Sequence, residues 1–170
     1  MNFVQEKTIE NILQRHILDS LQISEHIDYQ NDIVFDIGSG AGFPGMVLAI
    51  GGVQKINLVE PTGKKVIFLD HIKNLYNLKI AIHQSTWQQL KLHNATMVVS
   101  RAYTKLSNLL EVFVFVSRET IAAKGIFLKG EKLDNEICEA QQKWTFSYET
   151  YPSVTHEKGR IIKVWNVIRK

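Results

Sequence analysis

The chain has 170 residues, of which 45% are apolar and 22% charged, and its one cysteine is Cys138. This length and composition fit a single globular domain and exclude a disordered, collagen-like or disulfide-stapled chain. The longest apolar stretch, 46–53, is far shorter than the roughly 20 residues of a membrane span, and residues 1–10 lack the apolar core of a signal peptide. We therefore expect a cytoplasmic protein without membrane association, and a monomer.

Charge is distributed unevenly along the chain. Residues 1–60 hold 3 Lys or Arg and 8 Asp or Glu, whereas residues 61–170 hold 17 and 9, and the net charge is +3. A basic C-terminal part favours a polyanionic partner such as RNA. The alternative is that these lysines lie on solvated helix faces.

Apolar periodicity predicts a helix over 4–27, where apolar residues recur at three- and four-residue steps. These residues are Ile9, Ile12, Leu13, Ile17 and Leu21. Further along the chain, β-rich runs alternate with helical patterns. We expect strands at 33–37, 55–60, 79–83, 97–100, 125–129, 145–151 and 160–168, and helices at 44–50, 63–76, 106–121 and 131–144.

This order of elements predicts the fold class. Strands that alternate with helices are typical of an α/β protein with a doubly wound parallel sheet, and the two consecutive strands at the end predict one antiparallel strand. We therefore expect a mostly parallel seven-stranded sheet in one domain, 1–170, with an N-terminal helical segment at 1–30 and an α/β core at 31–170.

A glycine-rich loop follows the first predicted strand. It holds Gly38, Gly40, Gly42 and Gly45, and the acid Asp36 precedes it. Glycines at alternate positions let the backbone approach a ligand where a β-carbon would clash, and in a doubly wound sheet ligands bind at this edge. A plain tight turn is the alternative without a ligand.

Two classes of ligand fit this loop. Gly40, Gly42 and Gly45 satisfy the G-x-G-x-x-G pattern of dinucleotide binders, and Glu60 lies where a ribose-binding acid is expected. However, the carboxylate of Asp36 would repel a pyrophosphate and suits a ligand with an ammonium or sulfonium cation. S-adenosylmethionine (AdoMet) carries both cations, so the loop favours an AdoMet-dependent methyltransferase over a dinucleotide-binding oxidoreductase.

The residues after the fourth predicted strand bear on the methyl acceptor. Enzymes that methylate an exocyclic amine often carry Asn/Asp-Pro-Pro-Tyr/Phe there, whereas this chain reads Ser100-Arg101-Ala102-Tyr103. Cys138 lies in a polar helix without an evident activating setting. An acceptor with a free lone pair, such as guanine N7, needs only alignment. Arg101 would then hold guanine O6, a phosphate or the AdoMet carboxylate.

Several blocks together resemble one family. They are Arg15-His16-Ile-Leu-Asp19-Ser20, the loop from Asp36 through Phe43-Pro44 to Gly45, Lys64-Lys65-x-x-Phe68-Leu69, Gln84-Ser85, Ser100-Arg101-Ala102 and Leu128-Lys129-Gly130. In order and spacing the chain resembles the RsmG (GidB) family of bacterial methyltransferases. The resemblance implies methylation of a guanosine at N7 in the 530 loop of 16S ribosomal RNA, with the small ribosomal subunit as partner.

The resemblance also implies roles for individual residues. Arg101 is the expected catalytic residue. The residues expected to bind AdoMet are Asp36, Gly38, Ser39, Gly40, Phe43, Glu60 at the ribose, Trp87 and Gln88 near the adenine, and Arg101. The residues loosely expected to contact RNA are His16, Lys64, Lys65 and Lys129. The histidines show no metal-ligand spacing, so we expect no metal.

Two features depart from the family pattern. Gln88 stands where a Glu is usual, and the N-terminus is shorter than in typical members. Besides a dinucleotide-binding oxidoreductase, two alternatives stay open, the first because of these departures and the second because it shares the cofactor loop. One is an RNA-binding or assembly module that binds AdoMet without turnover, and the other is a methyltransferase that acts on a small molecule.

Overall fold

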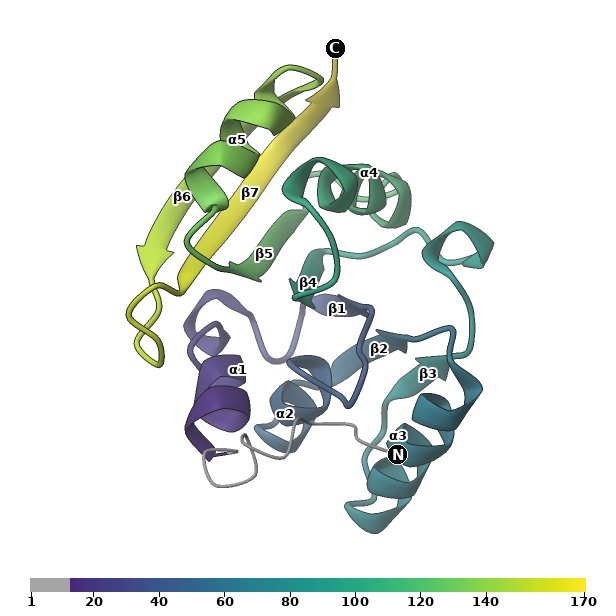
Figure 1. The fold of residues 1–170 in the computed structure, drawn as a ribbon. Helices are drawn as coiled ribbons and strands as arrows, with labels where there is room; N and C mark the ends of the chain where they lie inside the picture. The colour runs from purple at the N-terminus through teal and green to yellow at the C-terminus, as the bar shows by residue number, and fades with distance from the viewer. Residues whose placement is uncertain (1–12) are drawn as a thin grey trace.

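The computed structural model describes residues 13–170, and it contains one seven-stranded sheet (Figure 1). The strand order is β3-β2-β1-β4-β5-β7-β6, and β7 alone runs in the direction opposite to the other strands. The strands are β1 (Ile33–Ile37), β2 (Lys55–Val59), β3 (Ala81–His83), β4 (Met97–Arg101), β5 (Lys124–Lys129), β6 (Trp144–Pro152) and β7 (Arg160–Arg169). The predicted doubly wound sheet with one antiparallel strand is confirmed.

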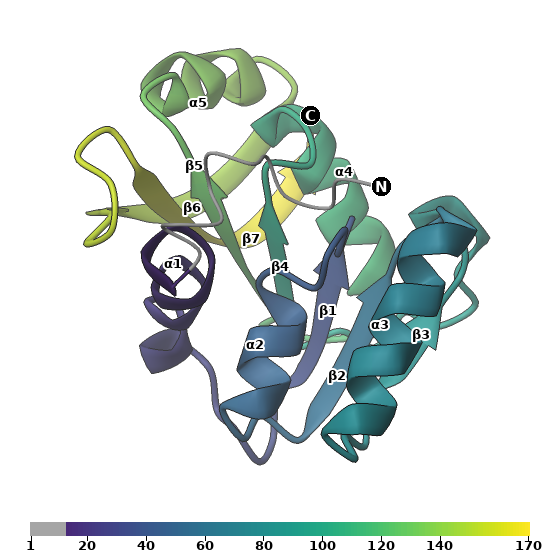
Figure 2. The ribbon, with the colours of Figure 1, turned by 60° about the horizontal axis from the view of Figure 1, so that its bottom comes forward.

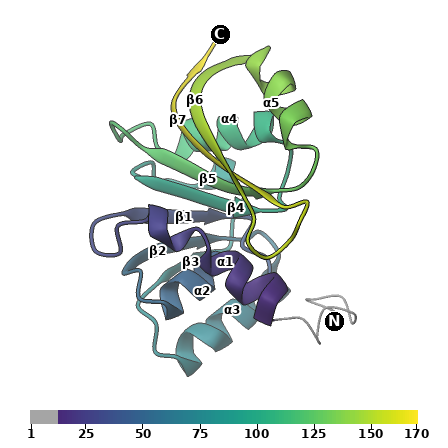
Figure 3. The ribbon, with the colours of Figure 1, turned by 90° about the vertical axis from the view of Figure 1, so that its left-hand side faces the viewer.

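Helices cover both faces of the sheet, as Figure 3 shows, with α4 and α5 on one face and α1, α2 and α3 on the other. The main helices are α2 (Gly45–Ile50), α3 (Gly63–Leu75), α4 (Leu106–Val116) and α5 (Leu133–Gln141), and a 3-10 turn, η4 (Trp87–Gln89), follows β3. Because both faces are covered, the central strands are apolar throughout rather than alternating. None of the helices in 13–170 is long and apolar enough to cross a membrane.

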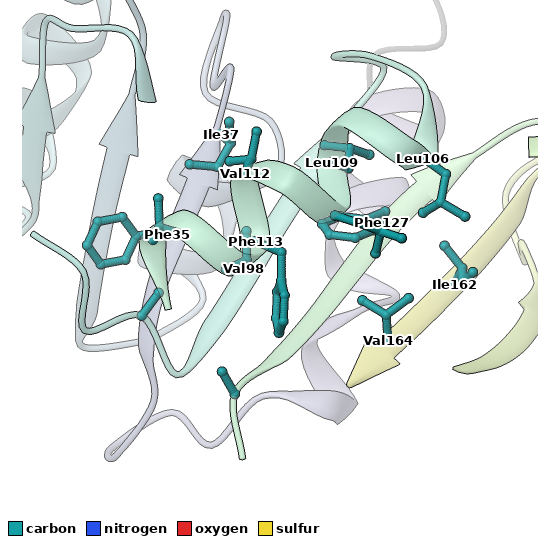
Figure 4. Packing of buried hydrophobic residues seen from close by; sticks show 14 of the residues in the cluster. Phe35, Ile37, Val98, Leu106, Leu109, Val112, Phe113, Phe127, Ile162 and Val164 are labelled. Atoms are coloured by element: carbon teal, nitrogen blue, oxygen red, sulfur yellow. The ribbon is translucent and has the colours of Figure 1, made fainter. Parts of the chain in front are cut away.

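Two hydrophobic clusters hold the layers together. Figure 4 shows the one beneath α4, where Leu109 and Phe113 pack against Phe127 of β5 and Val164 of β7. The other joins α2 and α3 to the opposite face of the same strands. This packing holds the strands' carboxyl ends at one edge, where the loops after β1, β2 and β4 meet.

The helix expected over 106–121 is wrong in its last turns, since α4 ends at Val116. The hydroxyl of Ser117 donates back to the Phe113 carbonyl at 2.6 Å, and the Glu119 N–H donates to the His93 carbonyl instead of continuing the helix. A side-chain donor and a long-range acceptor therefore accompany the end of the helix, although the apolar pattern continues. The helix expected over 131–144 is also shorter, and Trp144 opens β6 instead.

The helix expected over 4–27 is confirmed in part, because 13–21 and 24–26 are helical but irregular; residues 4–12 lie outside the described residues. Residues 13–26 form a π-helical turn, η2 (Leu13–Leu18), a short α1 (Asp19–Leu21) and a 3-10 turn, η3 (Ser24–His26). Side-chain donors also bond to two carbonyls of this segment. Ser20 Oγ donates to the His16 carbonyl at 2.5 Å, and Arg101 donates to the Arg15 carbonyl at 2.8 Å.

The β6–β7 hairpin loop lies beside this N-terminal segment, as Figure 2 shows for the loop and α1. Thr155 Oγ1 donates to Asp19 Oδ1 at 2.7 Å, and the Val154 N–H donates to Gln22 Oε1 at 3.0 Å. Segments more than 130 residues apart in sequence are thus joined next to the end of β4.

Candidate functional site

The glycine loop links β1 to α2 at the carboxyl edge of the sheet. Gly38, Gly40 and Gly42 have φ of +70°, +59° and +97°, a region that favours glycine. Ser39 is buried; its hydroxyl donates to the Asp36 carbonyl and accepts from the Val59 N–H. The side chain of Ser39 therefore fixes the loop to both strands, and its expected contact with AdoMet stays a prediction.

Asp36 lies fully buried at the end of β1, beneath the loop. Its Oδ2 accepts from the Gly45 N–H at 2.9 Å, at the start of α2, while its Oδ1 is buried without a hydrogen-bond partner. Burial raises the pKa of this carboxyl to about 7, although the hydrogen bond from Gly45 favours the charged form. A β-carbon on Gly45 would lie 2.7 Å from Oδ2, so this contact requires glycine.

Glu60 lies just past β2 and faces the same loop. Its two carboxylate oxygens accept from the Gly40 N–H at 3.0 Å and the Thr62 N–H at 2.9 Å, and Lys65 Nζ lies 3.7 Å away. These hydrogen bonds and Lys65 lower the pKa of Glu60 despite burial, which acts in the opposite direction. A carboxylate has about four acceptor positions, so Glu60 retains capacity for ribose hydroxyls.

Three buried side-chain atoms in residues 13–170 have no hydrogen-bond partner, and all three belong to this edge. They are Asp36 Oδ1, His16 Nε2 and Ser85 Oγ. Buried polar atoms are normally hydrogen-bonded, and an exception calls for an explanation such as a bound ligand. Ser85 follows β3 and was not among the predicted site residues, although the Gln84-Ser85 block contained it.

Arg101 ends β4 and connects the N-terminal segment to the glycine loop. Its Nη1 lies 3.2 Å from Asp19 Oδ2, and its Nη2 donates to His16 Nδ1 at 2.8 Å. Its Cζ lies 4.9 Å from the ring centroid of Phe43, which also stacks on the His16 ring at 4.8 Å. The sequence indicated neither this contact with Asp19 nor the packing of His16 on Phe43.

The state of His16 follows from these contacts. Arg101 can only donate, so Nδ1 accepts and the ring proton lies on Nε2. Burial, followed by the charge of Arg101, lowers the pKa of His16, and the ring is neutral at neutral pH. His16 thus presents a buried N–H donor without an acceptor among the described residues.

The other predicted residues have more ordinary surroundings. Trp87 packs edge-on against Phe115, with ring centroids 5.3 Å apart, on the side of the α4 cluster. Gln88 and Lys64 are exposed. Their expected roles at the adenine and at RNA stay predictions. No group of three or more His, Cys, Asp or Glu in 13–170 is placed to hold a metal ion.

Lys129 is tied into the scaffold rather than exposed. Its Nζ lies 2.6 Å from Glu136 Oε2 and donates to the Thr104 carbonyl at 2.8 Å, and its side chain is 8% exposed. Glu136 Oε2 also accepts from the Leu106 N–H at 2.7 Å, at the start of α4. This network fixes the 102–106 connection, and the contact of Lys129 with RNA stays a prediction.

Removing one partner from this network should destabilise the protein. We expect Glu136→Gln to lower the free energy of unfolding by about 2–3 kcal/mol, because it leaves a mostly buried ammonium group without its counter-charge. Glu139→Gln, on the same helix as Glu136, breaks an exposed pair with Lys105 and should cost about 0.5 kcal/mol or less. Urea unfolding of both variants measures the difference, and equal losses would contradict a special role for the buried pair.

A hollow of about 800 Å³ opens on the other side of Arg101. It is bounded by the N-terminal segment, the ends of β4 and β5, and the β6–β7 loop. The basic residues that line it outnumber the acids Asp19, Glu131 and Glu136, and they are Arg15, Arg101, Lys129, Lys132, Lys158 and Arg160. Arg101 thus separates the glycine loop from a basic hollow that suits a phosphate-bearing ligand.

Solved structures place this fold among known classes. A ribosomal protein L11 methylase from Lactobacillus delbrueckii superposes with a TM-score of 0.68 at 14% identity, over 90% of this chain and 77% of that one. Magnesium protoporphyrin IX methyltransferase from Synechocystis, solved with bound SAM, gives 0.66 at 16% identity, over 96% and 84%. The fold is that of the class I AdoMet-dependent methyltransferases.

The sequence comparisons identify the family within this class. A family model described as rRNA small subunit methyltransferase G matches residues 1–163. Proteins of that name from Rickettsia felis and Rickettsia prowazekii are 38% and 36% identical over 169 residues, covering 99% of this chain and 86% of theirs. The chain belongs to the rRNA small subunit methyltransferase G (RsmG, GidB) family, which confirms the resemblance of the motifs.

Proposed function

We propose that this protein transfers the methyl group of AdoMet to N7 of a guanosine in the 530 loop of 16S ribosomal RNA. The observation that carries the proposal is the set of buried polar atoms without partners at one edge of the sheet. In a chain of this family and fold, they indicate where a polar ligand is held.

The residues at this edge fit AdoMet. Asp36 Oδ1 offers a buried acceptor to the ammonium group, and Glu60 offers acceptors to the ribose hydroxyls. The loop from Gly38 to Gly42 allows close approach of the backbone. When bound, AdoMet supplies an electrophilic methyl group on a sulfonium cation.

The acceptor side fits an RNA nucleotide. Basic residues around the hollow, such as Arg15 and Lys132, would neutralise phosphates. Guanine N7 has a free lone pair, so the transfer requires alignment rather than a general base. Arg101 stays protonated at any working pH, which suits an orienting role.

Label transfer from methyl-labelled AdoMet tests this function. We expect label on 30S subunits that lack the modification, mapped to an N7-methylated guanosine in the 530 loop, and none on subunits already modified. Gly38→Val is the control variant, since its φ of +70° and the ring of Tyr103 leave no room for a branched side chain. Binding of AdoMet and 30S subunits without transfer would instead support an assembly module.

A further inference from the structure

Tyr103 follows β4, and its ring lies against the glycine loop that follows β1. A β-carbon on Gly38 would overlap Cδ2 of the Tyr103 ring and lie 3.0 Å from its Cε2 and Cγ. The ring therefore contacts the backbone of the first glycine after β1. It belongs to neither hydrophobic cluster and is 42% exposed.

The backbone that delivers this ring is strained. Ala102 has a φ of +51°, in the left-handed region that disfavours residues with a β-carbon. Strain of this kind clusters at functional sites. Ala102 also lines the basic hollow next to Arg101, so this turn leads from the hollow to the Tyr103 ring at Gly38.

We propose that the acceptor base stacks on the aromatic ring of Tyr103 during methyl transfer; this rests on the function proposed above. An extruded base is commonly held by stacking on an aromatic side chain. A nucleotide whose phosphate binds in the hollow would have its base close to this ring, because Arg101 and Ala102, which line the hollow, directly precede Tyr103. Stacking would fix the plane of the base, and with it the direction of the N7 lone pair.

The charge changes of the reaction give the ring a second effect. The N7 lone pair forms the new N–C bond while the C–S bond breaks, and its electron pair stays on sulfur. S-adenosylhomocysteine leaves as a neutral thioether, and the positive charge passes to the guanine ring. An aromatic face attracts a cation, so Tyr103 would stabilise the base more as its charge develops.

An alternative role for the Tyr103 ring is to cover the glycine loop, and the two roles have different consequences. A cover must move before AdoMet enters, so removing the ring would tighten AdoMet binding. A ring that stacks on the base acts on the acceptor, so removing it would slow methyl transfer and leave AdoMet affinity unchanged.

The test compares Tyr103→Leu and Tyr103→Phe with Tyr148→Leu, a matched control on β6 that is 41% exposed. We expect Tyr103→Leu to lower kcat about 10- to 100-fold, with AdoMet affinity by calorimetry within twofold of wild type. Tyr103→Phe should recover kcat to within about threefold, since its ring remains. Tyr148→Leu should retain wild-type kcat. Normal kcat in Tyr103→Leu would overturn the proposal, as would tighter AdoMet binding with unchanged kcat.

A fluorescence measurement tests stacking without turnover. In Tyr103→Trp, 7-methylguanosine added with S-adenosylhomocysteine should quench the new indole emission more than guanosine does, because the methylated base is cationic. The same change at Tyr148 should show no such difference. Absence of quenching in Tyr103→Trp contradicts the proposal even if the wild-type protein transfers no methyl group. Quenching without any transfer by the wild-type protein would contradict only the proposed function.

Discussion

Replacing Asp36 with asparagine should weaken AdoMet binding about 100-fold and stabilise the ligand-free protein above pH 7. The loss of affinity follows from removing a charged acceptor for the ammonium group, because hydrogen bonds to charged groups are the strong ones. The amide keeps the shape of the side chain and can still accept from the Gly45 N–H. Calorimetry with AdoMet measures the affinity, and thermal unfolding measures the stability.

The sign of the pH dependence follows from the raised pKa of Asp36. Its folded-state pKa is about 7 against an ordinary value of 3.8. Between these pH values the folded chain keeps a proton that the unfolded chain has lost. The free energy of unfolding therefore falls as pH rises from about 4 to about 7, and it stays lower above that. Asp36→Asn should remove this fall, by at most about 4 kcal/mol at about 1.4 kcal/mol per pKa unit.

AdoMet affinity should change with pH in the opposite direction. An ammonium group favours the carboxylate form of Asp36, so wild-type affinity should rise up to about tenfold per unit as pH approaches 7, and then level off. Asp36→Asn should show no such rise. Asp70→Asn, at an exposed carboxyl on α3, is the control and should behave as wild type. Wild-type affinity in Asp36→Asn would remove this carboxyl from the AdoMet site.

The sheet and its order along the chain were predictable because their signals are local. An apolar run that ends in glycines marks β1, and two final strands without an intervening helix required an antiparallel pair. The irregular form of the N-terminal helical segment was not predictable, for the opposite reason. Its apolar spacing is helical, but the Arg15 carbonyl is taken by Arg101, a residue 86 positions away that no local pattern reveals.

For the same reason, some residues of the candidate site were predictable from the sequence and others were not. Asp36 and the glycines form a contiguous motif, so their place at the carboxyl edge of the sheet followed from the sequence. The contact of Tyr103 with Gly38 depends on a left-handed turn at Ala102, and alanine has no strong preference that signals such a turn. Lys129 looked available for RNA, whereas its partner Glu136 comes from a helix that sequence alone could not place beside it.

Arg101→Ala and Arg101→Lys should both fold and lose methyl transfer activity by about 100-fold, the cost expected when reacting groups are misaligned. Lysine keeps the charge but cannot contact Asp19 and His16 together, because it lacks the planar fork of the guanidinium group. Arg118→Ala, which removes a comparable arginine–aromatic contact with Phe115, is the control and should retain activity.

A double-mutant cycle separates the two ways in which Arg101 can act. If Arg101 works by holding the N-terminal segment through Asp19, then Asp19→Ala alone should lose much of the activity, and adding Arg101→Ala should cost little more. If the guanidinium group contacts the RNA or the AdoMet carboxylate, the two losses should be nearly independent, and Arg101→Ala should be far the larger. An alteration confined to AdoMet affinity would assign Arg101 to the carboxylate, whereas loss of kcat at unchanged affinity would assign it to the acceptor. Arg101 lies between the glycine loop and the basic hollow, so each of these roles affects methyl transfer. Wild-type turnover in Arg101→Ala would rule all of them out, and Arg101 would then join β4 to the N-terminal segment without an effect on activity.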